Sequence, residues 1–104
     1  MFNKVDQTAR VIPDEKLRAH IFIEGQVQGV FYRVWCKKQA SKHDLCGWVR
    51  NTDDGRVEVV AEGEKNKLTK LIELVKEGPK FAKVENVDVA YEKATGEFDS
   101  FEII

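Results

Sequence analysis

Apolar and polar residues alternate near the start of the chain, which is the pattern of a strand with one buried face. From Leu17 to Glu24 every second residue is apolar, and most of those between are polar. Alternation of this kind places one set of side chains against a core. The preceding residues, 1–16, show no periodicity and are interrupted by Pro13. We therefore expect a flexible extension over residues 1–16 and one folded domain over residues 17–104.

Two later stretches carry the periodicity of amphipathic helices. In residues 32–43 an apolar residue recurs every four positions, which predicts a helix with a narrow buried stripe. That stripe consists of Tyr32, Cys36 and Ala40. In residues 64–77 apolar residues recur at intervals of three and four, as on the buried face of a second helix. This second stripe consists of Leu68, Leu71, Ile72 and Val75.

The remaining apolar runs predict four more strands. Residues 46–52 and 56–62 are expected to pair as a hairpin, because the Asp-Asp-Gly sequence between them accepts positive φ. Residues 81–93 predict another strand, and its apolar pattern changes phase at residues 85–86, where we expect a bulge. Residues 98–104 predict a short final strand.

The predicted order is β-α-β-β-α-β with an extra terminal strand. Two helices with one apolar face each can cover one face of an antiparallel sheet. We therefore predict an α+β fold of the ferredoxin-like, split βαβ type, with four to five antiparallel strands and both helices on one face.

Composition and charge exclude several classes of function. The 104-residue chain has a net charge of -1, so it lacks the basic field that gathers nucleic acid. No apolar run is long enough to cross a bilayer and no signal-peptide core is present, so we expect a cytoplasmic protein without a membrane partner. Cys36 and Cys46 lack metal-ligand spacing. They are expected to be buried free thiols, with a Cys36–Cys46 disulfide as the alternative.

A glycine-rich turn joins the first predicted strand to the first predicted helix. Its sequence is Gly25-Gln26-Val27-Gln28-Gly29-Val30-Phe31-Tyr32-Arg33. Gly29 accepts a conformation that other residues resist, and Arg33 offers a fork of donors suited to phosphate oxygens. Successive N–H groups in such a turn can converge on one anion at a helix N-terminus. The candidate ligands are the backbone N–H groups of Gln28, Gly29, Val30, Phe31, Tyr32 and Arg33. A tight connection with a surface arginine is the alternative.

A second stretch, residues 47–63, places an unusual residue near the end of a strand. Asn51 is a poor strand former and comes just before the predicted hairpin turn. A turn-initiating cap is one interpretation. The other is an uncharged donor and acceptor that holds a water molecule.

Together the two stretches resemble the acylphosphatase family. Residues 25–33 match its signature G-x-V-Q-G-V-x-F/Y-R at every fixed position, and residues 47–63 match G-aromatic-V/A/C-K/R-N-x-x-x-G-x-V with its later glycine. The resemblance spans residues 17–104. It implies hydrolysis of acyl phosphates to a carboxylate and inorganic phosphate, without metal or cofactor. It also implies that Arg33 and the backbone of residues 28–32 bind phosphate, or a similar anion, and that Asn51 orients water.

Elementary chemistry agrees with this implication. The carboxylate leaving group, with a conjugate-acid pKa of ~4–5, departs as an anion and needs no general acid. A loose phosphoryl-transfer transition state needs mainly positioning and charge stabilisation. We therefore expect no base among His20, His43 or the acidic residues, and we expect His43 to bond helix-terminal carbonyls.

Two other functions are compatible with the same fold. One is an accessory domain acting on carbamoyl phosphate, as in the hydrogenase-maturation carbamoyltransferases. The other is a nucleic-acid-binding sheet with Phe22 as an exposed aromatic, although the net charge and missing ribonucleoprotein motifs oppose it. For the enzyme we expect a monomer acting on a small-molecule acyl phosphate. No residue specifies which acyl phosphate that is.

Overall fold

The computed structural model describes residues 15–104, which form two helices and five strands. In chain order they are β2 (Lys16–Gln26), α1 (Tyr32–Lys42), β3 (Cys46–Asn51), β4 (Val57–Glu64), α2 (Lys65–Glu77), β5 (Lys83–Lys93) and β6 (Phe101–Ile103). The predicted extension lies outside the described residues except at its end. There Lys16 already pairs with Glu64 in the sheet, so the first strand begins earlier than predicted.

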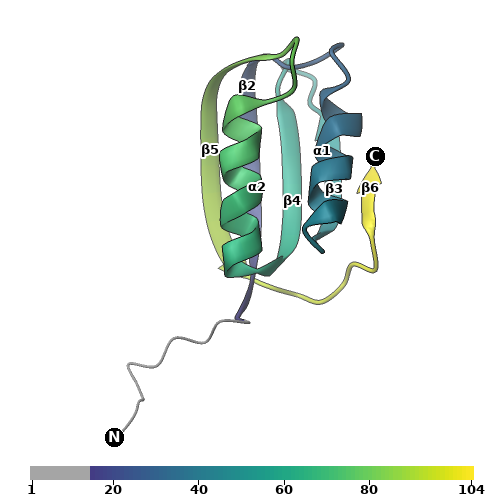
Figure 1. Cartoon of the computed structure of the whole chain (residues 1–104), viewed down its shortest axis with the longest axis vertical. Helices are drawn as coiled ribbons and strands as arrows, with labels where there is room; N and C mark the ends of the chain where they lie inside the picture. Colours follow the sequence, from purple (N-terminus) through teal and green to yellow (C-terminus); the bar gives the residue numbers. More distant parts are fainter. Residues whose placement is uncertain (1–14) are drawn as a thin grey trace, which may run out of the picture.

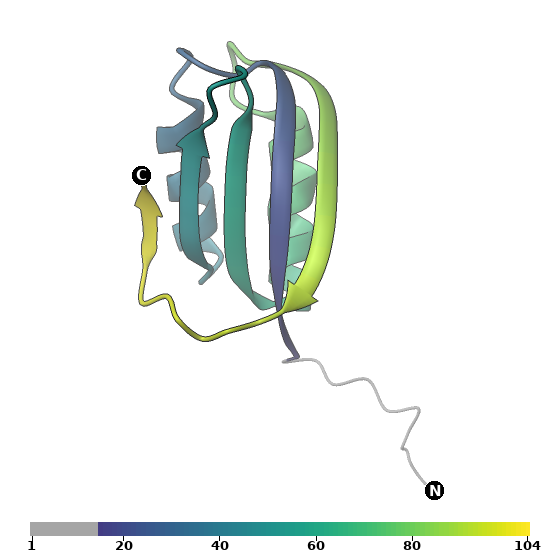
Figure 2. The ribbon, with the colours of Figure 1, turned by 180° about the vertical axis from the view of Figure 1, so that it is seen from behind.

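The five strands form one sheet in the order β5-β2-β4-β3-β6. Neighbouring strands are antiparallel except for β3 and β6, which are parallel. The predicted antiparallel sheet is therefore confirmed for four strands and wrong for the last. Figure 2 shows the reason, because the chain leaving β5 crosses the end of the sheet to the opposite edge and then runs alongside β3. Both helices cover the same face, as predicted (Figure 1).

The core lies between this helix-covered face and the two helices. Alternate residues of β2 face inward, and each pairs with an inward residue of β4, as Ile21 does with Val59. Both predicted helix stripes are buried, which confirms the periodicity of the helical stretches. The buried helix residues are Tyr32, Cys36, Ala40, Leu68, Leu71, Ile72 and Val75.

The predicted bulge in the edge strand is confirmed, but the predicted start of that strand is wrong. Glu24 pairs with Asn86 and Gly25 with Val84, so Glu85 is the extra residue of the bulge. The strand begins at Lys83, because the preceding residues form a turn closed by the Ala82 N–H and the Pro79 carbonyl at 3.0 Å. Phe81 lies in this turn with its side chain 76% exposed, so its apolar character was misleading.

The face of the sheet without helices is held together by buried carboxylates. Glu58 lies 2.6 Å from His20 Nε2 and accepts from Arg50 Nε at 2.7 Å. Phe22, the aromatic expected on this face, is covered by the Arg56 guanidinium, 4.3 Å from the ring centroid. A covered ring cannot stack a base, which opposes the nucleic-acid function.

Both cysteines carry free thiols, which confirms that part of the prediction over the disulfide alternative. Burial raises the pKa of the Cys36 thiol to about 12, so this side chain acts as a small apolar group of the core. Cys46 is only partly enclosed. No helix within residues 15–104 has the length and apolarity needed to span a membrane.

Candidate functional site

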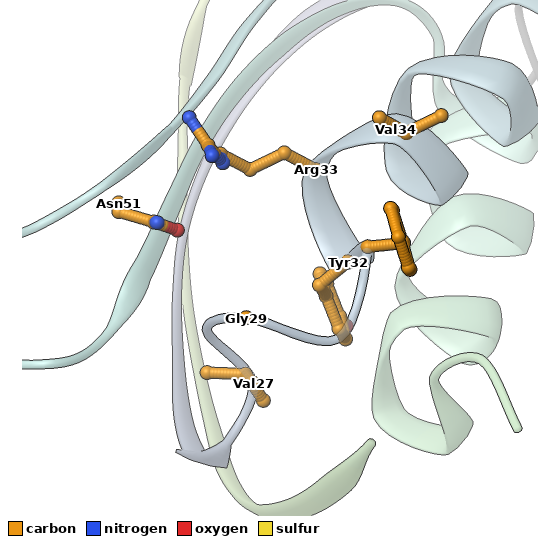
Figure 3. Close-up of a pocket in the computed structure, with 7 residues that line it drawn as sticks. Val27, Gly29, Tyr32, Arg33, Val34 and Asn51 are labelled. Atoms are coloured by element: carbon orange, nitrogen blue, oxygen red, sulfur yellow. The ribbon is translucent and has the colours of Figure 1, made fainter. Parts of the chain in front are cut away.

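The glycine-rich turn after β2 and the end of β3 line one cavity of about 320 Å³. Figure 3 shows the Arg33 and Asn51 side chains projecting toward one another across it. The structure therefore brings together the two side chains predicted to carry the chemistry. The lining consists of Val27, Gly29, Phe31, Tyr32, Arg33, Val34 and Asn51. Gln28 and Val30, also predicted as backbone ligands, are not part of that lining.

The two glycines that bracket the turn serve different purposes. Gly25 has φ +132°, and a Cβ there would lie 2.1 Å from the Lys83 carbonyl oxygen. Only glycine lets β2 pass this close to β5 as the chain enters the turn. Gly29 has φ +75° with open space around it, so the backbone conformation alone requires glycine there.

The N–H groups of the turn are available to a ligand. Within residues 15–104, none of the loop, turn or cap hydrogen bonds uses an N–H of residues 28–33 as donor. Helix α1 begins without a side-chain cap and without an acidic residue in its first turn. Unpaired donors and the positive end of a helix dipole therefore meet at one place, which favours an anion.

Phe31, the residue just before α1, has an unusual conformation that sequence reasoning missed. Its φ and ψ are 61° and 25°, in the left-handed region, and its side chain is 83% exposed. Bulky residues avoid this region, so such an outlier marks a functional or strained position. Its only sequence signal is an aromatic residue where a helix usually has Ser, Thr, Asp or Asn.

Arg33 is the second residue of α1, and its guanidinium has no carboxylate partner among residues 15–104. Arg18, Arg50 and Arg56 each form an ion pair with a carboxylate. Across residues 15–104, Arg33 is the arginine without such a pair. An uncompensated guanidinium beside unpaired N–H groups is suited to a phosphate group.

Asn51 reaches the cavity because of the register of β3. It lies two positions after buried Val49 and opposite Val57, so its side chain is on the helix-covered face. Its Oδ1 is buried and, among the described residues, has no hydrogen-bond donor. An orphan acceptor of this kind costs about 1–3 kcal/mol, which is tolerated where a ligand or water completes it.

The Gln28 side chain connects the turn to the hairpin that follows Asn51. Its Nε2 donates to the Thr52 carbonyl at 3.0 Å and to the Arg56 carbonyl at 2.9 Å. The sequence predicted a role only for the backbone of Gln28, because nothing in a single sequence pairs a glutamine side chain with carbonyls so far along the chain.

Tyr32 fixes the start of α1 against the other helix. Its hydroxyl donates to the Val75 carbonyl at 2.6 Å, and burial raises the pKa of Tyr32 far above its usual value. The two predicted non-catalytic histidines are bonded away from the cavity. His20 contacts Glu58, and His43 Nδ1 lies 2.8 Å from the Gln39 carbonyl near the end of α1, as predicted.

Comparison with known proteins identifies the family of the chain. The sequence model of the family described as Acylphosphatase matches residues 19–103. An acylphosphatase of Pyrobaculum calidifontis is 50% identical over 91 residues, which cover 86% of this chain and 83% of that protein.

Solved structures give the same result. The acylphosphatase of Bacillus subtilis superposes with a TM-score of 0.82 at 41% identity, covering 85% of this chain and 98% of that one. Full-length HypF matches with a TM-score of 0.77 at 26% identity, covering 93% of this chain but 12% of that one. The chain therefore belongs to the acylphosphatase family, whose members hydrolyse acyl phosphates, and it is an enzyme of that kind.

Proposed function

We propose that the Arg33 guanidinium and the backbone N–H groups of residues 28–33 hold the phosphoryl group, and that Asn51 orients the attacking water. One observation carries this proposal. The buried, unpartnered Asn51 Oδ1 lines the same cavity as Arg33, which has no carboxylate partner among the described residues. The first can accept a hydrogen bond from water while the second neutralises phosphate oxygens.

The reaction needs little more than this equipment. The water oxygen attacks phosphorus, and the bond between phosphorus and the carboxylate oxygen breaks. The carboxylate leaves as an anion, and the proton of the water passes to a phosphate oxygen, so the products are R–COO⁻ and dihydrogen phosphate. Charge on the equatorial oxygens is stabilised by Arg33 and the N–H groups, which are already in position before reaction.

The side chains of the cavity support transfer of the proton to the substrate itself. Arg33 and Tyr32 are the titratable residues of the lining. The Tyr32 hydroxyl donates a hydrogen bond to the Val75 carbonyl, and the guanidinium of Arg33 has donors but no acceptor for a proton. No general base is therefore offered by the described lining, in agreement with the proposed substrate-assisted step.

Similarity over most of the length of relatives named acylphosphatase favours hydrolysis of acyl phosphates over the role of a carbamoyl-phosphate accessory domain. We further propose that the enzyme acts as a monomer in the cytoplasm. The two side chains proposed to act, Arg33 and Asn51, meet within a single chain, and both thiols are free, as in a reducing compartment. Analytical ultracentrifugation of the purified protein measures its mass in solution, and the mass of a dimer would contradict the proposed monomer.

Replacing Arg33 tests the proposal as a whole. Arg33→Ala removes phosphate binding and transition-state charge together, so kcat/KM for benzoyl phosphate is expected to fall at least ~10²–10³-fold. Competitive inhibition by inorganic phosphate should be lost in the same variant. Arg50→Lys serves as the control, because Arg50 lies on the face of the sheet that the helices do not cover. This variant should keep both the turnover of benzoyl phosphate and the inhibition by inorganic phosphate. Near-normal turnover by folded Arg33→Ala would refute the assignment.

A further inference from the structure

Phe31 presents an apolar ring that the rest of the described chain does not use. Phe22 and Phe98 lie beneath arginine guanidinium groups, and Phe101 is buried in the core. Phe31 is 83% exposed and has no aromatic partner within residues 15–104. Phe31 therefore combines an unfavourable left-handed backbone with an exposed ring. Packing contacts within the described structure do not offset the free-energy cost of either feature.

The ring belongs to the apolar side of the cavity. Val34 comes three positions after Phe31, is 58% exposed and lines the same cavity. In Figure 3, Val34 lies on the helix side of the cavity and Asn51 on the strand side, with the Arg33 side chain extending between them. The lining thus has an apolar wall at the start of α1 and a polar wall at the end of β3.

The geometry of phosphoryl transfer assigns a different part of the reaction to each of these two walls. In a phosphoryl transfer the attacking and leaving oxygens are roughly in line. If Asn51 holds the water on the strand side, the carboxylate leaves toward the helix side. The acyl group attached to that carboxylate then lies against the apolar wall.

We propose that Phe31 and Val34 form an acyl-group subsite, which makes the enzyme prefer acyl phosphates with an uncharged, apolar acyl group such as an aromatic ring. The inference rests on the proposed function, because it uses the water position assigned to Asn51. Charge supports the same substrate class. Arg33 is the charged side chain of the described lining, and the phosphoryl group occupies it, so a charged acyl group finds no second cation there.

The experiment compares kcat/KM for benzoyl phosphate and acetyl phosphate in wild type and in Phe31→Asn. Asparagine tolerates the left-handed conformation and keeps the backbone N–H, so the turn is preserved. The benzoyl-to-acetyl ratio is expected to fall about 3- to 10-fold, the range of a lost aromatic contact. Phe31→Tyr keeps the ring and should keep the ratio. Phe81→Asn removes the other exposed phenylalanine ring, outside the cavity, and should leave both substrates unaffected.

A measurement on the wild-type enzyme requires no variant. Benzoate and acetate are the two carboxylate products, and benzoate is expected to inhibit competitively at a lower concentration. Equal inhibition, or a Phe31→Asn variant that loses both substrates in proportion, would overturn the subsite. Failure of the proposed function looks different, because Arg33→Ala would then retain turnover of both acyl phosphates.

Discussion

Asn51 carries a buried acceptor for which the described protein supplies no donor. If that acceptor holds the attacking water, Asn51→Ala should lower kcat by about 10²-fold, the lower range for loss of one positioned polar group. The inhibition constant of inorganic phosphate should change little, because Arg33 and the N–H groups remain. The free energy of unfolding should not fall, since removing an unsatisfied polar atom relieves its desolvation cost.

Steady-state kinetics, phosphate inhibition and urea denaturation check these three expectations together. Asn66→Ala is the matched control, because Asn66 is exposed on α2, which contributes no residue to the cavity lining. A parallel loss of turnover and phosphate binding would show that Asn51 holds phosphate instead. A loss of stability would favour the interpretation of Asn51 as a turn cap.

Among single residues, the sequence predicted which side chains share the cavity better than it predicted backbone conformation. Asn51 could be predicted as a site residue because asparagine is a poor strand former, and Arg33 because it follows a glycine-rich turn. Phe31 was assigned only a backbone N–H, because residue type favours no positive φ for phenylalanine. Its left-handed conformation arises from the path between β2 and α1, which only the folded chain defines.

The turn and the β3–β4 hairpin are separate elements that the Gln28 side chain holds together. Gln28→Ala removes two hydrogen bonds from Nε2 to hairpin carbonyls, so the free energy of unfolding should fall by about 1–3 kcal/mol. The hairpin also follows Asn51 directly, so the position of the water should loosen. We expect kcat to fall more than the affinity for inorganic phosphate.

Urea denaturation and phosphate-inhibited kinetics of the purified variant measure the two effects. Gln39→Ala is the matched control, since the Gln39 side chain, on α1, makes no hydrogen bond within the described residues. The role assigned to Gln28 is wrong if both glutamine variants lose the same stability and the same activity.

Elements with strong periodicity were predicted closely, and those fixed by distant contacts were not. The buried stripes of both helices came directly from residue spacing. The last strand has three residues, and its parallel pairing with β3 depends on how the chain crosses the sheet. Phe81 extended a predicted strand because apolar character alone cannot distinguish a strand from an exposed turn.

At the scale of the whole molecule, Glu62 joins the central strand β4 to the segment between β5 and β6, which crosses the end of the sheet. Its carboxylate pairs with Arg18 at 2.7 Å and accepts the N–H groups of Thr95 and Gly96 at 3.0 Å. Burial alone would raise the pKa of Glu62. The Thr95 N–H, the Arg18 guanidinium and the Gly96 N–H outweigh it and lower the pKa to about 2.

This lowered pKa predicts how stability depends on acid. Because the folded pKa lies below the ordinary value of 4.5, the stabilisation is complete above that pH and is lost as the pH falls toward about 2. The shift corresponds to about 3 kcal/mol. Glu62→Gln should therefore be less stable than wild type at pH 7, and the difference should shrink by pH 2.5.

Thermal or urea unfolding of both proteins between pH 7 and pH 2.5 provides the measurement. Glu73→Gln, on the exposed face of α2, controls for the loss of one carboxylate. A constant difference between wild type and Glu62→Gln across this range would contradict the linkage.

The left-handed backbone at Phe31 also bears on attempts to make this enzyme more robust. Glycine and asparagine accept that conformation without strain, so thermostability screens should enrich them repeatedly at position 31. Such variants would survive heating better while recognising acyl groups less selectively. Screening on heat resistance alone would thus favour enzymes that discriminate poorly among substrates, and a useful library would hold position 31 constant.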